Sequence, residues 1–253
     1  MIKFSGRNQP LYAKYSILDA LKVIKRLGFD GVELCLEVDE LAPKTLTQAL
    51  IVAIRTKVNA LDLSPHVIGY HKDYIYDDDL FAQTQMAIRL TPEFGANILL
   101  FSGATAKSED AWPRMIARTR ALVALAEEYG VILAQEFEPN FIVGSTANLL
   151  RMFDEIPSPN LQANLDLGHV FLCDPDPQAA IRQLKGRIVH GHVENMAAGV
   201  HDHLLPQEGD MNLSVYLRAL VEIGFDGALA LDLYKQDYEA VAGEAITYLR
   251  NLM

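Results

Sequence analysis

Apolar residues along this chain fall into two kinds of run, which alternate from one end to the other. Short apolar runs have the length of a strand, and each is followed by a longer segment whose apolar positions recur with helical spacing. Alternating strands and helices indicate a parallel sheet covered by helices. The predicted strands are 2–5, 31–36, 59–63, 97–102, 131–136, 161–166, 187–192 and 227–232.

Several of the predicted helical segments end in the same way, with a glycine. The clearest helical segments are 15–27, 109–129, 213–223 and 236–252. A glycine follows several helices directly before the next strand, where the left-handed backbone conformation is common. These glycines are Gly28, Gly95, Gly130 and Gly224. The phrases LGFDGVEL (27–34) and IGFDGALAL (223–231) repeat the same helix end, turn and strand near both ends of the chain.

Eight strand and helix units in 253 residues, without a Ser/Gly-rich or charged linker between them, predict one domain over 1–253. This count favours an α/β fold, the (β/α)₈ TIM barrel. A doubly wound open sheet is the alternative. The segment after the first strand, SGRNQPLY (5–12), has no glycine-rich phosphate loop, which argues against a nucleotide-binding sheet.

Composition narrows the choice of partners. The chain carries 33 acidic and 22 basic residues, a formal net charge of −11. Such a charge repels a phosphate backbone and an anionic membrane, so we expect neither nucleic acid nor membrane as a partner. Cys35 and Cys173 lie in apolar runs and are predicted to be buried, reduced thiols. No signal-type leader and no run of 18 apolar residues is seen, which predicts a cytoplasmic location.

Four consecutive predicted strands end in residues that can bind a metal. The carboxyl ends of the strands surround the active site in barrels of this kind. Strand alternation turns all four side chains into the barrel, where three carboxylates repel one another unless a cation joins them. A mainly oxygen ligand set with one imidazole suits Mn²⁺, Mg²⁺ or Co²⁺, and Zn²⁺ stays open. The four residues are Glu136, Asp166, His192 and Asp232.

The histidines cluster near the same strand ends. His66 follows the predicted third strand, His169 comes three residues after Asp166, and His190 precedes His192 on the seventh strand. A core histidine and a functional one are both open interpretations of His190. His201 and His203 belong either to a polar loop or to a second metal or substrate site. His71 has no assigned place and is predicted to be solvated.

With these residues in hand, the chain resembles the xylose isomerase-like barrel superfamily. That superfamily contains sugar and sugar-phosphate isomerases and epimerases, the inosose dehydratases and the endonuclease IV type. The resemblance spans the whole chain and is most specific from about 130 to 235. The phrases that carry it are GFDGVEL (28–34), QEFEPN (135–140), NLDLGH (164–169), HGHVEN (190–195), HDHLLPQEGDMN (201–212) and ALDLY (230–234).

The resemblance implies specific roles. Glu136, Asp166, His192 and Asp232 would hold a divalent metal, and Glu136 and Asp232 would also be the acid–base pair. The resemblance also implies that His169 touches the substrate, and further candidate substrate contacts are His66, His190, Glu138 and His203. In this scheme one carboxylate removes an α-proton and the metal stabilises the resulting enediolate.

Two residues depart from the family pattern. The eighth-strand ligand is usually glutamate, whereas Asp232 is one methylene shorter. The ketose epimerases also carry an arginine shortly after the Glu-Asn pair, whereas here Met196, Ala197 and Ala198 follow Asn195. The second departure argues against ketose 3-epimerisation in particular.

Several functions are compatible with these features. The first is a metal-dependent isomerase or epimerase of a small sugar, keto-sugar or sugar acid. An inosose-dehydratase-like lyase and a sugar-binding barrel without turnover are alternatives. An endonuclease IV-like phosphodiesterase is disfavoured because no Lys/Arg cluster forms a basic track. The partner in all but the last is a small sugar or polyol. Assembly into a homo-oligomer and a phosphate on the substrate both stay open.

Overall fold

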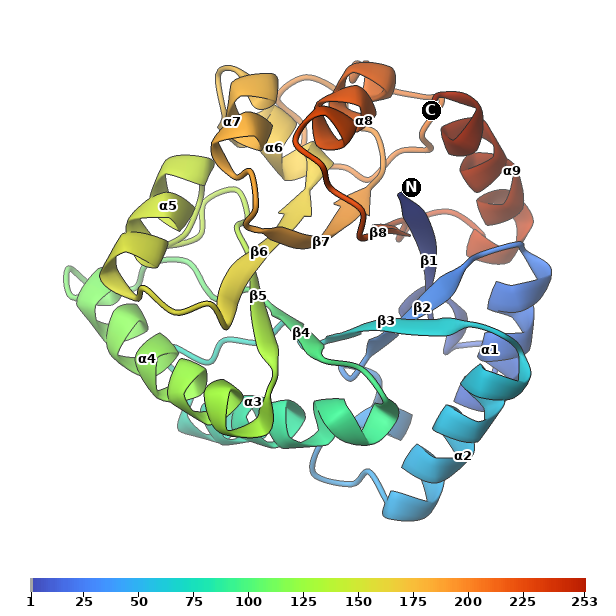
Figure 1. The fold of residues 1–253 in the computed structure, drawn as a ribbon, viewed down its shortest axis with the longest axis horizontal. Helices are drawn as coiled ribbons and strands as arrows, with labels where there is room; N and C mark the ends of the chain where they lie inside the picture. The colour runs from blue at the N-terminus through green and yellow to red at the C-terminus, as the bar shows by residue number, and fades with distance from the viewer. Residues whose placement is uncertain (1) are drawn as a thin grey trace.

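Eight parallel strands form a closed inner ring in the computed structural model, which describes residues 2–253 (Figure 1). Each strand pairs with its neighbours in sequence, and β1 pairs with both β2 and β8, so that the sheet has no free edge. The predicted (β/α)₈ barrel is therefore confirmed. The strands are β1 (Lys3–Arg7), β2 (Gly31–Cys35), β3 (Ser64–Gly69), β4 (Ile98–Phe101), β5 (Ile132–Glu136), β6 (Leu161–Asp166), β7 (Ile188–Val193) and β8 (Ala228–Leu231).

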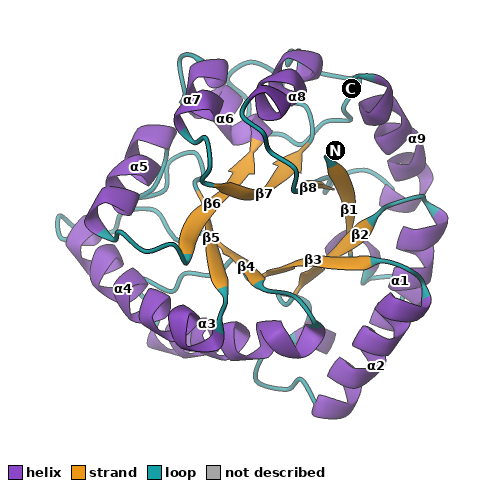
Figure 2. Cartoon of the chain, viewed as in Figure 1, coloured by secondary structure: helices purple, strands orange, loops and turns teal. Residues whose placement is uncertain are grey.

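Helices surround this ring on its outside (Figure 2). One α-helix follows each strand except β6, which two short helices follow. These α-helices are α1 (Ile17–Arg26), α2 (Gln48–Ala60), α3 (Asp78–Leu90), α4 (Ala111–Tyr129), α5 (Thr146–Glu155), α6 (Leu167–Cys173), α7 (Pro177–Gln183), α8 (Leu213–Glu222) and α9 (Tyr238–Asn251). Short 3₁₀ turns lie at η1 (Gln9–Leu11), η2 (Asp39–Leu41) and η3 (Thr91–Phe94).

The third predicted strand was wrong. Residues 59–63 do not form a strand, because α2 continues to Ala60 and Asp62 then takes a left-handed conformation with φ 50°. The strand begins only at Ser64 and contains His66. The misplacement arose because NALDL is a short, mostly apolar run of strand length, although its first two residues complete the last turn of a helix.

Helix ends follow the local chemistry of the sequence. Ser16 caps α1, because its side chain accepts a hydrogen bond from the backbone N–H of Asp19. The first N–H groups of a helix lack the usual backbone partner one turn earlier, so the cap stabilises the first turn. All four predicted helix-end glycines have positive φ, and Gly130, at 64°, forms the left-handed end of α4. These capping residues explain why helix boundaries were predicted to within about two residues.

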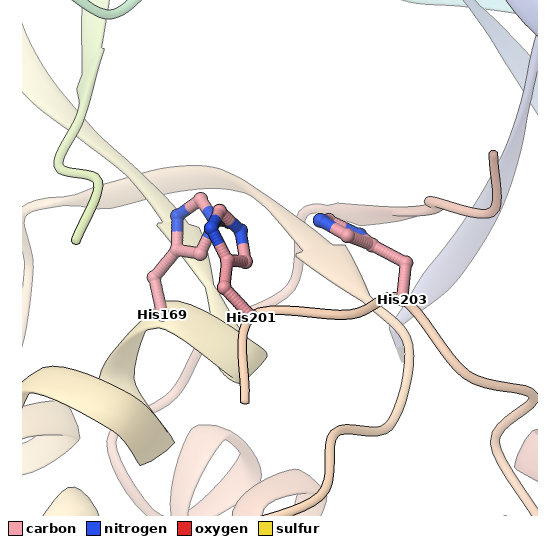
Figure 3. Close-up of side chains that lie close together, drawn as sticks. All are labelled: His169, His201 and His203. Atoms are coloured by element: carbon pink, nitrogen blue, oxygen red, sulfur yellow. Dashed lines mark hydrogen bonds between the residues drawn. The ribbon is translucent and has the colours of Figure 1, made fainter. Parts of the chain in front are cut away.

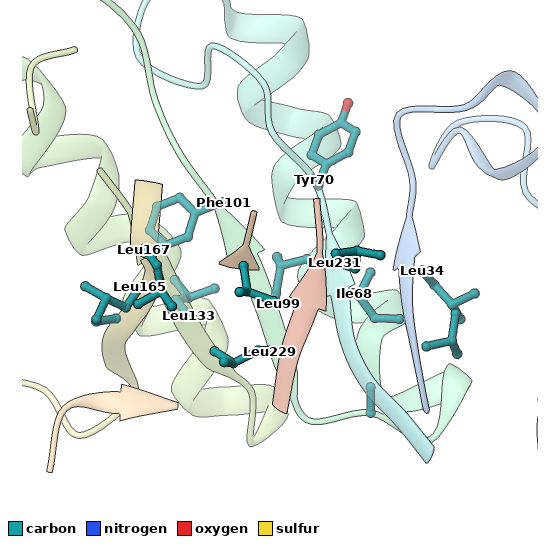
Figure 4. Close-up of a cluster of buried hydrophobic side chains, with 14 of the residues drawn as sticks. Leu34, Ile68, Tyr70, Leu99, Phe101, Leu133, Leu165, Leu167, Leu229 and Leu231 are labelled. Carbon is teal, nitrogen blue, oxygen red and sulfur yellow. The ribbon is translucent and has the colours of Figure 1, made fainter. Parts of the chain in front are cut away.

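The hydrophobic core lies between the strands and the helices. Leu99, Leu133, Leu165 and Leu229 are fully buried on the strands and belong to one apolar cluster (Figure 4). The interior of the barrel is different, because inward positions of β5 and β8 carry the small Ala134 and Ala230. Buried polar side chains such as Asn164 and His190 fill part of the space that branched apolar residues occupy in many barrels of this type.

No helix within residues 2–253 is both long enough and apolar enough to span a membrane.

Candidate functional site

The carboxyl ends of β5 to β8 bring together the four residues predicted to bind a metal. Adjacent strands are staggered, with Glu136 opposite Asn164 and Asp166 opposite His192. This stagger, which barrel closure requires, places residues from different strands at one level of the mouth. All four side chains, those of Glu136, Asp166, His192 and Asp232, are at most 3% exposed.

His192 lies at the centre of this group. Its Nδ1 atom is 2.9 Å from Oε1 of Glu136, 3.6 Å from Oδ2 of Asp166 and 3.5 Å from Oδ2 of Asp232. Burial opposes a charged imidazole, but Glu136 and Glu33 raise the pKa of His192 well above its usual value. The ring nitrogen thus points to where three carboxylates converge.

Asp166 shows how the NLDLGH phrase builds its part of the site. It ends β6 and is also the N-cap of α6, where its Oδ1 accepts the backbone N–H of His169 at 2.8 Å. Its other oxygen, Oδ2, is buried without a hydrogen-bond partner. One carboxylate therefore starts a helix, places His169 on its first turn and keeps one oxygen for the site.

The residues present fit a divalent cation. Donor atoms of Glu136, Asp166 and His192 lie within 4.8 Å of one another, and these groups are buried. Nδ1 of His192 lies close to carboxylate oxygens without a well-aligned hydrogen bond, and Oδ2 of Asp166 has no hydrogen-bond partner. Such buried polar atoms are costly unless another group binds them. Asp232 forms a second close set with Asp166, Glu194 and His203. Two carboxylates and an imidazole, with a third carboxylate beside them, form a suitable ligand set.

Glu33 orients the central imidazole from behind. Its Oε2 lies 2.9 Å from Nε2 of His192, which therefore carries the proton. Once its second proton has left, His192 would carry its lone pair on Nδ1, which faces the carboxylates. A carboxylate that holds the second nitrogen of a ligand histidine is a common arrangement in metal sites.

A group of three histidines lies beside these carboxylates. His169 projects from α6, and His201 and His203 come from the loop after β7 (Figure 3). Nδ1 of His169 donates to the carbonyl of Phe137 at 2.8 Å, so its Nε2 accepts from Nε2 of His201 at 3.0 Å. Burial lowers the pKa of His203 to about 4 and also lowers that of His201. Neutral imidazoles of this kind are suited to bind a substrate hydroxyl or a metal.

The three histidines line one cavity of about 170 Å³ at the barrel mouth, together with Glu136 and Asp232. Its lining residues are His71, Glu136, Glu138, His169, His201, His203, Asp232 and Tyr234. The prediction that His71 is solvated was wrong, because its Nδ1 lies 3.1 Å from Oε2 of Glu136. Burial and the neighbouring Glu136 raise the pKa of Glu138. The sites predicted at His169, Glu138 and His203 therefore do share the cavity with Glu136 and Asp232.

Two predicted substrate contacts do not lie in this cavity. His66 sits on β3, where its Nδ1 is 2.5 Å from the hydroxyl of Ser5. His190 lies inside the barrel, where its Nδ1 donates to Asn164 at 2.8 Å, and Nδ2 of Asn164 donates to Oε1 of Glu136 at 2.8 Å. Burial lowers the pKa of His190 to about 3. The corrected position of His66 follows from the later start of β3, and His190 supports Glu136 through Asn164.

Glu194 is a fully buried carboxyl group beside Asp166. Its Oε1 accepts the backbone N–H of Gly168 at 2.8 Å, and burial together with Asp166 raises its pKa well above the usual range. Gly168 has no space for a side chain, because a Cβ atom there would meet Glu194 and lie 2.8 Å from Sδ of Met196.

We expect the Gly168→Ala variant to lose about 1–3 kcal/mol of unfolding free energy, because overpacking at a buried site forces its neighbours to move. Urea unfolding of the variant and of Gly130→Ala, where no atom lies within 4 Å of the added carbon, measures this effect. In Gly130→Ala the cost comes from the left-handed backbone alone. An unfolding free energy in Gly168→Ala no lower than in Gly130→Ala would contradict the expected overpacking.

Sequence reasoning missed Arg7, Glu33 and Glu194, all of which are buried at the mouth. Signals for two of them were present. Glu33 is the one charged residue in the apolar run GVELCL, and Glu194 continues the alternation of His190 and His192. Arg7 was hidden because the predicted first strand stopped at residue 5, whereas β1 continues to Arg7.

The model of the xylose isomerase-like TIM barrel family matches residues 21–252, nearly the entire chain. The chain belongs to the xylose isomerase-like TIM barrel family. The family resemblance of the sequence is thereby confirmed. Membership also agrees with the position of the candidate site at the carboxyl ends of the strands.

Two relatives illustrate the range of similarity by sequence. The uncharacterized protein MJ1311 of Methanocaldococcus jannaschii is 32% identical over 117 residues, which cover 44% of this chain and 40% of that protein. The fructoselysine 3-epimerase of Shigella flexneri is 22% identical over 271 aligned positions, covering 99% of this chain and 96% of the epimerase. Among its relatives the chain thus counts a sugar epimerase of similar length.

Solved structures show the same fold. The probable 3-DHS dehydratase AsbF from Bacillus anthracis superimposes with a TM-score of 0.85 at 19% identity, and 99% of each chain is covered. The IOLI protein with a bound zinc atom superimposes with a TM-score of 0.83 at 18% identity, covering 99% of this chain and 96% of the other. Structural neighbours of the barrel therefore include a protein that carries a metal.

Proposed function

We propose that this protein is a divalent-metal-dependent isomerase or epimerase of a small keto-sugar or related polyol. The observation that carries the proposal is the convergence of Glu136, Asp166 and Asp232 on Nδ1 of His192, with buried atoms that lack any other partner. Epimerases among the relatives support the reaction class. The zinc bound to a structural neighbour supports the metal.

Each residue has a role in this proposal. Glu136, Asp166 and His192 would hold the cation, with Asp232 as the fourth ligand, and the set accepts Mn²⁺, Mg²⁺, Co²⁺ or Zn²⁺. When bound, the cation stabilises negative charge on a substrate oxygen while the neighbouring C–H bond is broken. Glu136 and Asp232 come from β5 and β8 and both line the cavity, so one can remove a proton and the other can return one.

Substrate contacts would come from the polar wall of the cavity. His169, His203 and Glu138 line it and present groups that hydrogen-bond to hydroxyls. Lysine and arginine are absent from the lining, although a phosphate is usually held by such side chains or by a helix N-terminus. The volume of about 170 Å³ suits a small molecule. We therefore propose an unphosphorylated substrate.

We expect the metal-loaded protein, incubated in D₂O with ketoses, inososes and sugar acids, to place deuterium on the carbon next to the carbonyl group of at least one of them. Proton magnetic resonance and mass spectrometry of the recovered compounds measure this exchange. Matching ketose phosphates should exchange more slowly, because the cavity lining has no lysine or arginine to hold the phosphate. A panel without any deuterium uptake, with Mn²⁺ bound, would refute the proposal.

A dehydratase is the second candidate. A 3-dehydroshikimate dehydratase of Bacillus anthracis is 27% identical over 89 residues, covering 35% of this chain. The same carboxylates would remove the α-proton, and a β-hydroxyl would then leave as water. The two reactions differ in the product, because only the lyase product is lighter than the substrate by one water.

A further inference from the structure

Arg7 is a buried cation at the barrel mouth that the proposed reaction does not use. It ends β1 and is 1% exposed. Because β1 pairs with both β2 and β8, its side chain lies between Glu33 and Asp232. Its Nε donates to Oε1 of Glu33 at 2.9 Å, and its Nη1 contacts Oδ1 of Asp232. The guanidinium therefore links two buried carboxylates.

Two further N–H groups of Arg7 also donate to the protein, so that four of its five donors have a partner. Its Nη1 donates to the hydroxyl of Tyr234 at 2.9 Å, and its Nη2 donates to Oε1 of Gln9 at 3.2 Å. Arg7 is not among the residues that line the cavity. A guanidinium with its donors taken up in this way is not free to bind a substrate, so any effect on the reaction passes through its partners.

Asp232 is the partner that faces the cavity. Arg7 takes its Oδ1, whereas Oδ2 accepts from the hydroxyl of Tyr234 at 3.1 Å and lies 3.5 Å from Nδ1 of His192. The two oxygens thus have different neighbours, which fixes the plane of the carboxylate. An aspartate at this position has a short side chain, and its contacts decide where its free oxygen points.

The same arginine reaches the central histidine through Glu33. Arg7 holds Oε1 of Glu33, and Nε2 of His192 donates to Oε2 of the same carboxylate. The contacts consequently form a closed ring, which runs from Asp232 through Arg7, Glu33 and His192 and back to Asp232. The ring sets the direction of one carboxylate and one imidazole together.

We propose that Arg7 is a positioning residue for Asp232. The guanidinium holds one oxygen of Asp232 and one of Glu33. Asp232 thereby presents only Oδ2 to the cavity, and Nδ1 of His192 faces the candidate metal site. Lysine cannot replace the fork, because an ammonium is a point charge without the planar pair of donors. The inference rests on the proposed function in one respect, that Asp232 transfers a proton.

The first test is the rate of α-proton exchange in Arg7→Lys. We expect kcat to fall by about 10–100-fold, the range typical of residues that orient others, with KM unchanged. Mn²⁺ affinity, measured by calorimetry on chelator-treated protein, should stay near that of wild type because the charge is kept. Arg182→Met removes an exposed arginine paired with Glu222 at 3.1 Å and should change neither quantity. Wild-type kcat in Arg7→Lys would overturn the proposal.

The second test does not need a substrate. In Arg7→Met the loss of a cation and the release of Asp232 should raise Mn²⁺ affinity, and this gain should be clearly smaller when Asp232→Asn is also present. An equal change in both backgrounds would overturn the proposal. This cycle stays informative if the exchange assay finds no substrate, an outcome that would refute the proposed function alone.

Tyr234→Phe provides a readout if Arg7→Met does not fold. This substitution removes the hydroxyl that contacts both Arg7 and Asp232. Tyr234 is 50% exposed. We expect a lower kcat with an unchanged KM and an unchanged melting temperature. An unchanged kcat in both Tyr234→Phe and Arg7→Lys would show that the ring does not position Asp232.

Discussion

Glu136→Gln is expected to reduce α-proton exchange by about 10²–10⁴-fold, the contribution typical of a positioned general base. The amide cannot accept the proton, and it removes a charge from the centre of the candidate metal site. The fold should persist, because glutamine has nearly the same volume and its oxygen can still accept from Asn164, as Oε1 of Glu136 does at 2.8 Å. Deuterium exchange with an active ketose and circular dichroism together measure both parts of this expectation.

Glu128→Gln is the matched control for this substitution. Glu128 lies on α4, is exposed and lies outside the candidate site. The two variants make the same chemical change and lose the same charge. A loss of exchange in Glu136→Gln alone would therefore show that the effect depends on the position of Glu136 and not on the net charge of the protein. Wild-type exchange in folded Glu136→Gln would contradict the assignment of Glu136 as base.

Removal of the metal is expected to stop exchange and to lower the melting temperature by about 5–10 °C. A ligand at 100 times its Kd stabilises the folded state by about 2.7 kcal/mol, and about 2–4 °C accompany each kcal/mol in a chain of this size. The proposed cation would also lie among Glu136, Asp166 and Asp232 and offset the repulsion between their charges. Differential scanning calorimetry before and after chelation, followed by addition of Mn²⁺, Mg²⁺, Co²⁺ or Zn²⁺, measures the effect.

Asp166→Asn controls for unspecific effects of the chelator. Asparagine retains an oxygen that can accept the backbone N–H of His169 as the N-cap of α6, so the local structure should persist. The variant has lost one charged ligand, so its melting temperature should respond little to chelation. An equal shift in wild type and variant would mean that the stabilising cation binds elsewhere.

Local signals were sufficient for most of the fold. Runs of strand length, helical periodicity and helix-end glycines each depend on neighbouring residues, and together they predicted the number and order of units. The third strand failed for the same reason, because NALDL is consistent locally with a strand. Asn59 and Ala60 continue α2, whose buried residues are Ile51, Ile54 and Val58, and NALDL by itself does not show that continuation.

The candidate site was predicted only in part. Glu136, Asp166 and His192 could be found because each lies at or next to the end of a strand, and strand ends meet at the barrel mouth. His71 lies in a loop, so no periodic pattern relates it to Glu136. Arg7 and Asp232 are 225 residues apart, and their contact exists because the barrel closes between β1 and β8.

The sequence by itself determined the class of fold, the strands that carry the carboxylates and the family resemblance. These features depend on residue type and spacing, which are local along the chain. The tertiary structure alone decided which side chains share the cavity, that His66 and His190 lie outside it, and that Arg7 and Glu33 stand behind Asp232 and His192. Such relations depend on strand stagger and barrel closure, which join residues that lie far apart in the chain.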